Sequence, residues 1–265
     1  MSTFLYGGNV QANGIRQHYL RYGGKGPALI LIPGITSPAI TWGFVAERLG
    51  AQFDTYVLDV RGRGLSSTGP ELDYSADTCA ADIGAFADAL NLHSYHLMGH
   101  SMGARFAVRS AVLQPQGVNR VVLIDPPVSG PGRREYPSKL PWYVDSIRQS
   151  LVGMDAEAMR AFCATWTDEQ LQLRAEWLHT CYEPAIVRAF NDFHTVDFHH
   201  DLHHLKAPAL LMVAGRGGVI LDEDIGEIQD LQPAIQVARV PNAGHMIPWD
   251  DFDGFFHALG DFLEQ

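Results

Sequence analysis

Short, mainly apolar runs alternate with longer segments of helical periodicity through most of the chain. The runs occupy residues 28–32, 55–58, 95–98, 121–124, 210–213 and 235–240. Runs of this length are typical of parallel strands that are buried on both faces. Apolar positions recur with helical spacing in residues 76–90, 102–113, 222–231 and 252–263. This alternation predicts an α/β protein in which helices flank a mostly parallel sheet.

The N-terminal residues follow a different pattern, which predicts a hairpin. Asn13-Gly14 separates two strand-like segments, residues 3–10 and 15–22. An Asn-Gly pair favours the positive φ angles of a tight two-residue hairpin loop. These two strands raise the predicted sheet to eight strands.

One long segment, residues 126–205, contains no convincing strand and is rich in aromatic side chains. Thr167 and Gln170 have the spacing of a capping box, and Pro184 suits the first turn of a helix. We therefore predict a helical lid inserted after the sixth strand. The α/β core would then comprise residues 1–125 and 206–265.

Charge and composition narrow the possible partners. The chain has 19 Lys and Arg side chains against 30 Asp and Glu, a formal net charge of −11. Non-specific nucleic-acid binding needs a basic surface, so we expect no nucleic-acid partner. The N-terminus lacks the pattern of a secretory signal, and no apolar run is long enough to span a bilayer. The three cysteines are too widely spaced to suggest a disulfide framework. We expect a cytoplasmic protein without a membrane partner; the oligomeric state stays open.

The sharpest chemical motif is a G-x-S-x-G centred on Ser101. Residues 99–103, with the sequence GHSMG, follow one apolar run and lead into a helical segment. A side chain at the apex of a strand-to-helix turn needs strained backbone angles, and flanking glycines let neighbouring segments approach. The helix directs its N-terminal amides toward the serine hydroxyl. The motif predicts a nucleophile, although Ser101 could merely cap the helix.

A nucleophilic serine needs a base, and His245 is the best placed of the twelve histidines. It ends the sequence PNAGH, residues 241–245, between the last predicted strand and the closing helix. Catalytic groups of α/β sheets lie on loops at the carboxyl ends of strands. We predict that His245 is the general base; a surface histidine without a catalytic role is the alternative.

With these motifs the chain resembles the α/β-hydrolase family along nearly its whole length. Residues 31–35, LIPGI, resemble the family's His-Gly loop after the third strand, with Pro33 in place of the histidine. Residues 59–66, DVRGRGLS, match its D-x-R-G-x-G-x-S segment. The motifs are specific only in combination. The resemblance implies an oxyanion hole formed by the backbone amides of Ile35 and Met102.

The chain departs from this family at the catalytic acid. Most members have an Asp in a G-x-x-D turn after the seventh strand, but here Gly218 stands at that position. A buried imidazolium without a partner would cost free energy, so another carboxylate must serve as the catalytic acid. Asp125 ends the sixth predicted strand, where some family members carry their acid. We predict Asp125, with Asp222 or Asp224 as alternatives; Asp125 could also only cap the lid entry through its Asp-Pro-Pro turn.

Ser101, His245 and Asp125 together predict a cofactor-free hydrolase that forms an acyl-enzyme with a small carbonyl substrate. Residues 123–127 (LIDPP) and 244–250 (GHMIPWD) also resemble hydrolases of bacterial pyridine-ring breakdown, the route of nicotinate degradation. This implies hydrolysis of the C–N bond of an N-formyl amide, with release of formate. A carboxylate on the substrate would need an arginine. The sequence offers six without ranking them: Arg105, Arg133, Arg134, Arg148, Arg174 and Arg188.

Several alternatives stay open at this point. A carboxylesterase, an enol-lactonase or a C–C bond hydrolase would use the same residues, and a ligand receptor with a hydrolase fold would need no nucleophile. The histidines of residues 199–204 have helical spacing that could bind zinc, but the segment leads directly into a strand, so we predict no metal site. Gly62 and Gly64 lack the third glycine of a dinucleotide fingerprint, so we predict no nucleotide cofactor.

Overall fold

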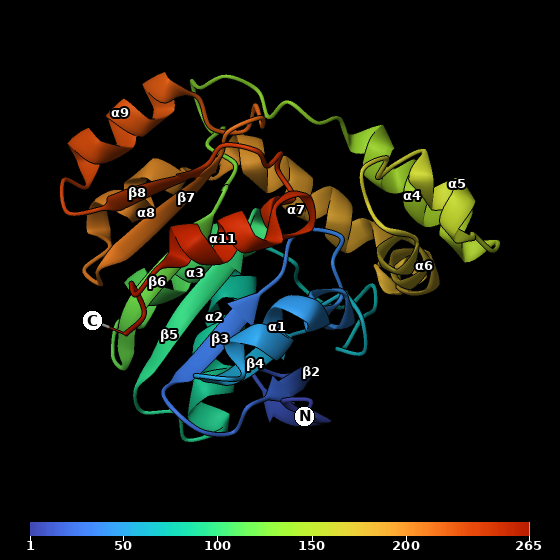
Figure 1. Ribbon diagram of the computed structural model, residues 1–265, viewed down its shortest axis with the longest axis horizontal. Coiled ribbons are helices and arrows are strands. Elements are labelled where there is room, and N and C mark those ends of the chain that lie inside the picture. The colour runs from blue at the N-terminus through green and yellow to red at the C-terminus, as the bar shows by residue number, and fades with distance from the viewer. Residues whose placement is uncertain (265) are drawn as a thin grey trace.

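A sheet of eight strands crosses the part of the molecule that the structure describes, residues 1–264, in the order β1-β2-β4-β3-β5-β6-β7-β8 (Figure 1). In this computed structural model, β2 is antiparallel to β1 and β4, and the other neighbouring strands are parallel. The predicted mostly parallel sheet is therefore confirmed. The strands are β1 (Phe4–Ala12), β2 (Ile15–Tyr22), β3 (Ala28–Ile32), β4 (Asp54–Leu58), β5 (Tyr95–His100), β6 (Val118–Ile124), β7 (Ala209–Ala214) and β8 (Gln236–Val240).

Helices cover both faces of this sheet. The helices α2 (Ala76–Ala89) and α3 (Met102–Leu113) pack together behind it in the view of Figure 1, whereas α1 (Gly43–Leu49) and α11 (Phe252–Leu259) lie in front. The remaining elements before and after the inserted segment are η1 (Ala39–Trp42), α9 (Asp222–Leu231) and α10 (Ile247–Asp250). The closing helix is shorter than the predicted 252–263, because Gly260 takes a φ of 52° and ends the helical geometry.

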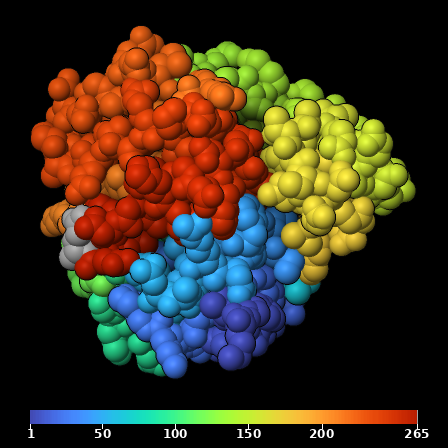
Figure 2. Space-filling model, viewed as in Figure 1, coloured from blue at the N-terminus to red at the C-terminus, as the bar shows by residue number. Residues whose placement is uncertain are grey.

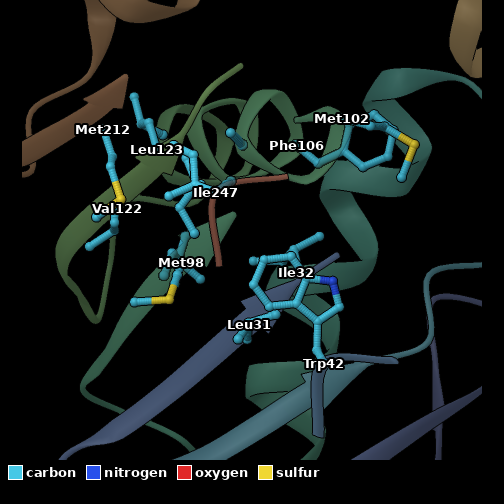
Figure 3. Packing of buried hydrophobic residues seen from close by; sticks show 14 of the residues in the cluster. Leu31, Ile32, Trp42, Met98, Met102, Phe106, Val122, Leu123, Met212 and Ile247 are labelled. Carbon is cyan, nitrogen blue, oxygen red and sulfur yellow. The ribbon is translucent and has the colours of Figure 1, made fainter. Parts of the chain in front are cut away.

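Almost all side chains of β5 and β7, and those of the second half of β6, are buried. Met98, Val122 and Met212 come from three neighbouring strands, β5, β6 and β7, and none is exposed (Figure 3). Burial of such side chains contributes about 1.5–3 kcal/mol each. The strand order reverses between β3 and β5, so the loops after these two strands diverge and leave a crevice at their carboxyl ends.

All secondary-structure elements between β6 and β7 are helices. They are α4 (Leu140–Leu151), α5 (Ala156–Arg160), α6 (Asp168–Trp177), η2 (Leu178–Thr180), α7 (Glu183–Thr195) and α8 (Phe198–His204). The first three helices form a lobe at one side of the molecule, beside the C-terminal elements (Figures 1 and 2). The Thr167 side chain accepts a hydrogen bond from the Gln170 amide, as the capping-box pattern predicts. None of the helices in residues 1–264 has the length and hydropathy needed to cross a membrane.

Candidate active site

The backbone at Ser101 has the strained geometry that the sequence motif requires. Ser101 joins β5 to α3 with φ 54° and ψ −118°, a region that few residues other than glycine adopt. A Cβ atom at Gly103 would lie 2.1 Å from the Ile32 carbonyl oxygen, and one at Gly99 would lie 2.3 Å from the Gly103 oxygen. Glycine at both positions therefore lets the helix start directly against the end of β3.

His245 reaches this serine from the loop after β8. Its Nε2 atom lies 3.0 Å from Ser101 Oγ. The Gly244 amide donates to the Asp250 carboxylate over 2.9 Å, which ties the loop to α10 and restricts its conformation. The His245 side chain is one-quarter exposed, so it is accessible from the pocket described below.

Asp125 completes the arrangement from the end of β6. Its Oδ2 atom lies 2.7 Å from His245 Nδ1, and its Oδ1 atom accepts a hydrogen bond from the Ala214 amide over 3.2 Å. Because the carboxylate accepts from Nδ1–H, His245 Nε2 is left free to accept the Ser101 proton. The Asp125 side chain is only 1% exposed, so bulk water does not weaken this interaction.

The alternative carboxylates lie elsewhere. Asp222 pairs with Arg239. Asp224 pairs with Arg134 and accepts from the Leu221 amide over 2.7 Å, which caps α9. Both therefore stabilise the region around α9, and the structure brings neither into contact with His245.

The two predicted oxyanion-hole residues come from adjacent segments. Ile35 lies in the loop after β3, and Met102 is the first residue of α3, where amides lack an intrahelical partner. Arg63 contacts both residues: its Nε donates to the Ile35 carbonyl over 3.1 Å, and its Nη2 lies 3.3 Å from Met102 Sδ. The Asp59 carboxylate accepts from the Ala39 amide over 2.6 Å. The D-x-R-G-x-G-x-S segment thus braces the loop that carries Ile35.

These groups open onto a pocket of about 570 Å³. That volume is within the range of small-molecule sites, about 300–1,000 Å³. The core contributes Ser101, His245 and the loop after β3, and the helical segment contributes most of the aromatic lining. The aromatic residues that line the pocket are Tyr136, Trp142, Tyr143, Phe162 and Trp166.

Sequence reasoning missed Tyr136. Its hydroxyl lies 3.4 Å from His245 Nε2 and accepts from the Tyr143 hydroxyl at 3.4 Å. Burial raises the pKa of Tyr136 well above its ordinary value, and the nearby Asp125 charge acts in the same direction. The phenol therefore remains a hydrogen-bond donor at neutral pH. No local pattern around residue 136 marks it, because its position depends on how the irregular segment before α4 folds over the sheet.

His100, the residue that precedes Ser101, contacts the loop that carries His245. His100 Nε2 donates to the His245 carbonyl oxygen over 3.0 Å, and the two imidazole centroids lie 4.9 Å apart. The pKa of His100 is lowered to about 3, mainly by burial and also by the neighbouring His245. A neutral His100 thus supports the backbone of the catalytic loop.

The histidine-rich segment forms ordinary helical contacts. In α8, His204 Nδ1 donates to the His200 carbonyl over 2.8 Å, and His199 lies 3.9 Å from Glu227. No group of three or more His, Cys, Asp or Glu side chains within residues 1–264 is arranged to hold a metal ion.

Comparison with known proteins places this site in a family. The family model described as alpha/beta hydrolase fold matches residues 27–252. The chain belongs to the alpha/beta hydrolase family. The membership that the motifs implied is therefore confirmed.

Individual relatives extend the comparison. The chain is 76% identical to N-formylmaleamate deformylase of Pseudomonas putida over 100% of its own length and 99% of that protein. It is 54% identical to a crystallised N-formylmaleamic acid deformylase from Pseudomonas putida, with a TM-score of 0.93 over 96% of this chain and 100% of the other. The crystal structure of E-2-(acetamidomethylene)succinate hydrolase has a TM-score of 0.80 at 23% identity, over 99% and 100% of the two chains, and supports the fold alone.

Proposed function

We propose that this hydrolase is an N-formylmaleamate deformylase, which converts N-formylmaleamate to maleamate and formate in nicotinate degradation. The observation that carries the proposal is the 76% identity to the Pseudomonas putida deformylase across the full chain. The pocket is consistent with it, because a cavity of about 570 Å³ has room for a small linear amide next to Ser101.

In the proposed mechanism, Ser101 Oγ attacks the formyl carbon while His245 Nε2 takes the hydroxyl proton. Asp125 keeps Nδ1 protonated and stabilises the imidazolium. The amides of Ile35 and Met102 stabilise the oxyanion, an effect typically worth about 3–4 kcal/mol for one donor. His245 then transfers its proton to the amide nitrogen, the C–N bond breaks, and maleamate leaves.

Water completes the cycle by the reverse route. His245 removes a proton from water as it attacks the formyl-Ser101 ester, and the second tetrahedral intermediate collapses to formate and free enzyme. The leaving nitrogen lies between two carbonyl groups in the substrate, so it leaves more easily than the nitrogen of an ordinary amide. Residues of this chain carry out every proton transfer in this reaction.

Formate release from N-formylmaleamate tests the proposal directly. The purified chain and its S101A variant should be compared on this substrate, on p-nitrophenyl esters and on an enol-lactone, under identical conditions. We expect kcat/KM to be highest for N-formylmaleamate and turnover to be abolished by S101A. Faster hydrolysis of the esters or the lactone would assign the same residues to an esterase or a lactonase, and full activity of S101A would refute the nucleophile.

A further inference from the structure

The structure ranks the six arginines that the sequence left equal. Five of them are engaged outside the pocket. Arg105 donates to backbone carbonyls, among them those of Pro127 and Val196. The other four form ion pairs with acidic side chains: Arg133 with Glu227, Arg134 with Asp224, Arg148 with Glu183, and Arg188 with Asp192.

Arg174, on α6, lines the pocket and is only 3% exposed. Its Nη1 and Nη2 atoms donate to the carbonyl oxygen and Oγ1 of Thr36, each over 3.0 Å. Its buried Nε has no hydrogen-bond partner within residues 1–264. None of the ion pairs formed by the described residues includes Arg174. A guanidinium has five N–H donors, and these two bonds use only two of them.

A cation buried in this way is costly unless an anion joins it. The guanidinium carbon lies 5.8 Å from the ring centroid of Trp142 and 5.6 Å from that of Trp166. Both rings line the same pocket. They hold the planar group in one orientation and exclude water, which strengthens its attraction for a carboxylate.

The contact with Thr36 ties this charge to the loop that carries the proposed oxyanion donor. Thr36 follows Ile35, whose amide is the proposed oxyanion donor, and both residues line the pocket with Ser101. Only a short chain of atoms separates the formyl carbon of N-formylmaleamate from its carboxylate. A substrate with its formyl group at Ser101 can therefore extend its carboxylate along the same pocket.

We propose that Arg174 binds the substrate carboxylate and makes the enzyme selective for N-formyl amides that carry one. The proposal rests on the proposed function, because it concerns the same substrate in the same pocket. Arg216 also lines the pocket, but it is exposed to solvent and its Nη2 donates to Asn242 over 3.4 Å. Its charge is already hydrated, so it gains less from a carboxylate than Arg174 does.

The test compares R174Q with two matched variants, R216Q at the pocket rim and R148Q on the outer surface of the helical segment. Each is assayed on N-formylmaleamate and on p-nitrophenyl formate, an uncharged donor of the same acyl group. We expect R174Q to lower kcat/KM for N-formylmaleamate about 100-fold, mainly through KM. Its kcat/KM for p-nitrophenyl formate should stay within about threefold of wild type, and R148Q should change neither value.

Three results would overturn the proposal. An equal loss on both substrates would mean that Arg174 only supports the loop around Thr36. Unchanged kcat/KM of R174Q on both substrates would mean that Arg174 has no role in binding. If R216Q, and not R174Q, lost the preference for the charged substrate, the carboxylate would be assigned to Arg216. R174K, which keeps the charge but not the forked geometry, covers the case in which R174Q does not fold; it should retain part of the preference for the charged substrate.

A binding measurement separates this proposal from the proposed function. S101A should bind N-formylmaleamate in a calorimetric titration, and the double variant S101A/R174Q should bind it about 100-fold more weakly. Failure of the wild type to release formate from N-formylmaleamate would refute both proposals. Normal release by the wild type, with unchanged binding in the double variant, would refute only the role of Arg174.

Discussion

Asp125 Oδ2 lies 2.7 Å from His245 Nδ1 although 120 residues separate them along the chain. The contact follows from the order of the strands. β6, β7 and β8 are parallel neighbours, so Asp125 after β6 and the His245 loop after β8 lie at the same edge of the sheet. Gly217 and Gly218 occupy the turn after β7 where most family members carry their acid. A Cβ atom at Gly217 would lie 3.6 Å from Asp125 Oδ2, so the carboxylate occupies the space beside that turn. The structure thus brings a carboxylate from the end of β6, and none from this turn, to the His245 imidazole.

Replacement of Asp125 should nearly abolish catalysis. In D125A the imidazole loses the acceptor that selects its tautomer and stabilises its charge, so kcat should fall about 10³–10⁴-fold. Steady-state formate release measures this value. D222A and D224A are the matched controls, because their carboxylates pair with arginines near α9. A larger loss in either control than in D125A would place the catalytic acid on α9 instead of at the end of β6.

Removal of the Tyr136 hydroxyl should slow turnover without unfolding the protein. Its hydroxyl lies 3.4 Å from His245 Nε2, where the reacting atoms would be, and it stays protonated. We expect Y136F to lower kcat about tenfold, the effect of one neutral donor, and to change KM and Tm little. Y143F removes only the donor to Tyr136 and should have a smaller effect. Unchanged kcat in Y136F would limit this tyrosine to packing.

Chelators should leave the activity intact, because the proposed proton transfers need only Ser101, His245 and Asp125. The measurement is formate release before and after incubation with EDTA, followed by gel filtration. His200 and His204 are committed to a helix, where the His204 ring donates to the backbone of His200. If EDTA abolished the activity and added zinc restored it, the histidines of α8 would become the candidate metal ligands.

Acid should destabilise the fold through its buried neutral histidines. The pKa of His199 is lowered to about 4, mainly by burial and also by the nearby charge of Arg133. Below pH 6.5 the unfolded chain takes up a proton at this residue while the folded chain does not, so the free energy of unfolding falls as the pH drops from 6.5 toward 4. Between pH 7 and pH 5 this one histidine should contribute a loss of about 2 kcal/mol.

Urea unfolding at several pH values measures this dependence. H199Q should show a shallower decrease than wild type between pH 7 and pH 5, whereas replacement of the exposed His203 should not change the slope. His100 contributes in the same direction, since its pKa is about 3 in the folded protein, and so part of the acid sensitivity should persist in H199Q. An identical slope in H199Q and wild type would contradict the prediction.

Patterns within short stretches of sequence determined the parts of the fold that depend on local backbone geometry. The Asn13-Gly14 turn, with φ angles of 46° and 75°, marks a conformation that most residues adopt at a cost. The glycines around Ser101 mark positions where a Cβ atom would collide with the neighbouring backbone. Apolar runs of strand length indicated the buried parallel strands, and the loop with His245 could be located from its place after the last strand. The motifs therefore identified the nucleophile and the base as candidates.

Only the tertiary structure decided which distant side chains share the pocket. Arg174 and Arg148 belong to the same helical segment and are chemically identical, yet one is buried beside Thr36 and the other pairs with Glu183 at the surface. Tyr136 likewise reaches His245 because the segment after β6 folds over the carboxyl ends of the strands, whereas His100 contacts the His245 backbone from the end of β5. Periodicity in the sequence indicates which face of a helix or strand is buried. It does not indicate which residues that face packs against, because those contacts depend on the packing of the whole chain.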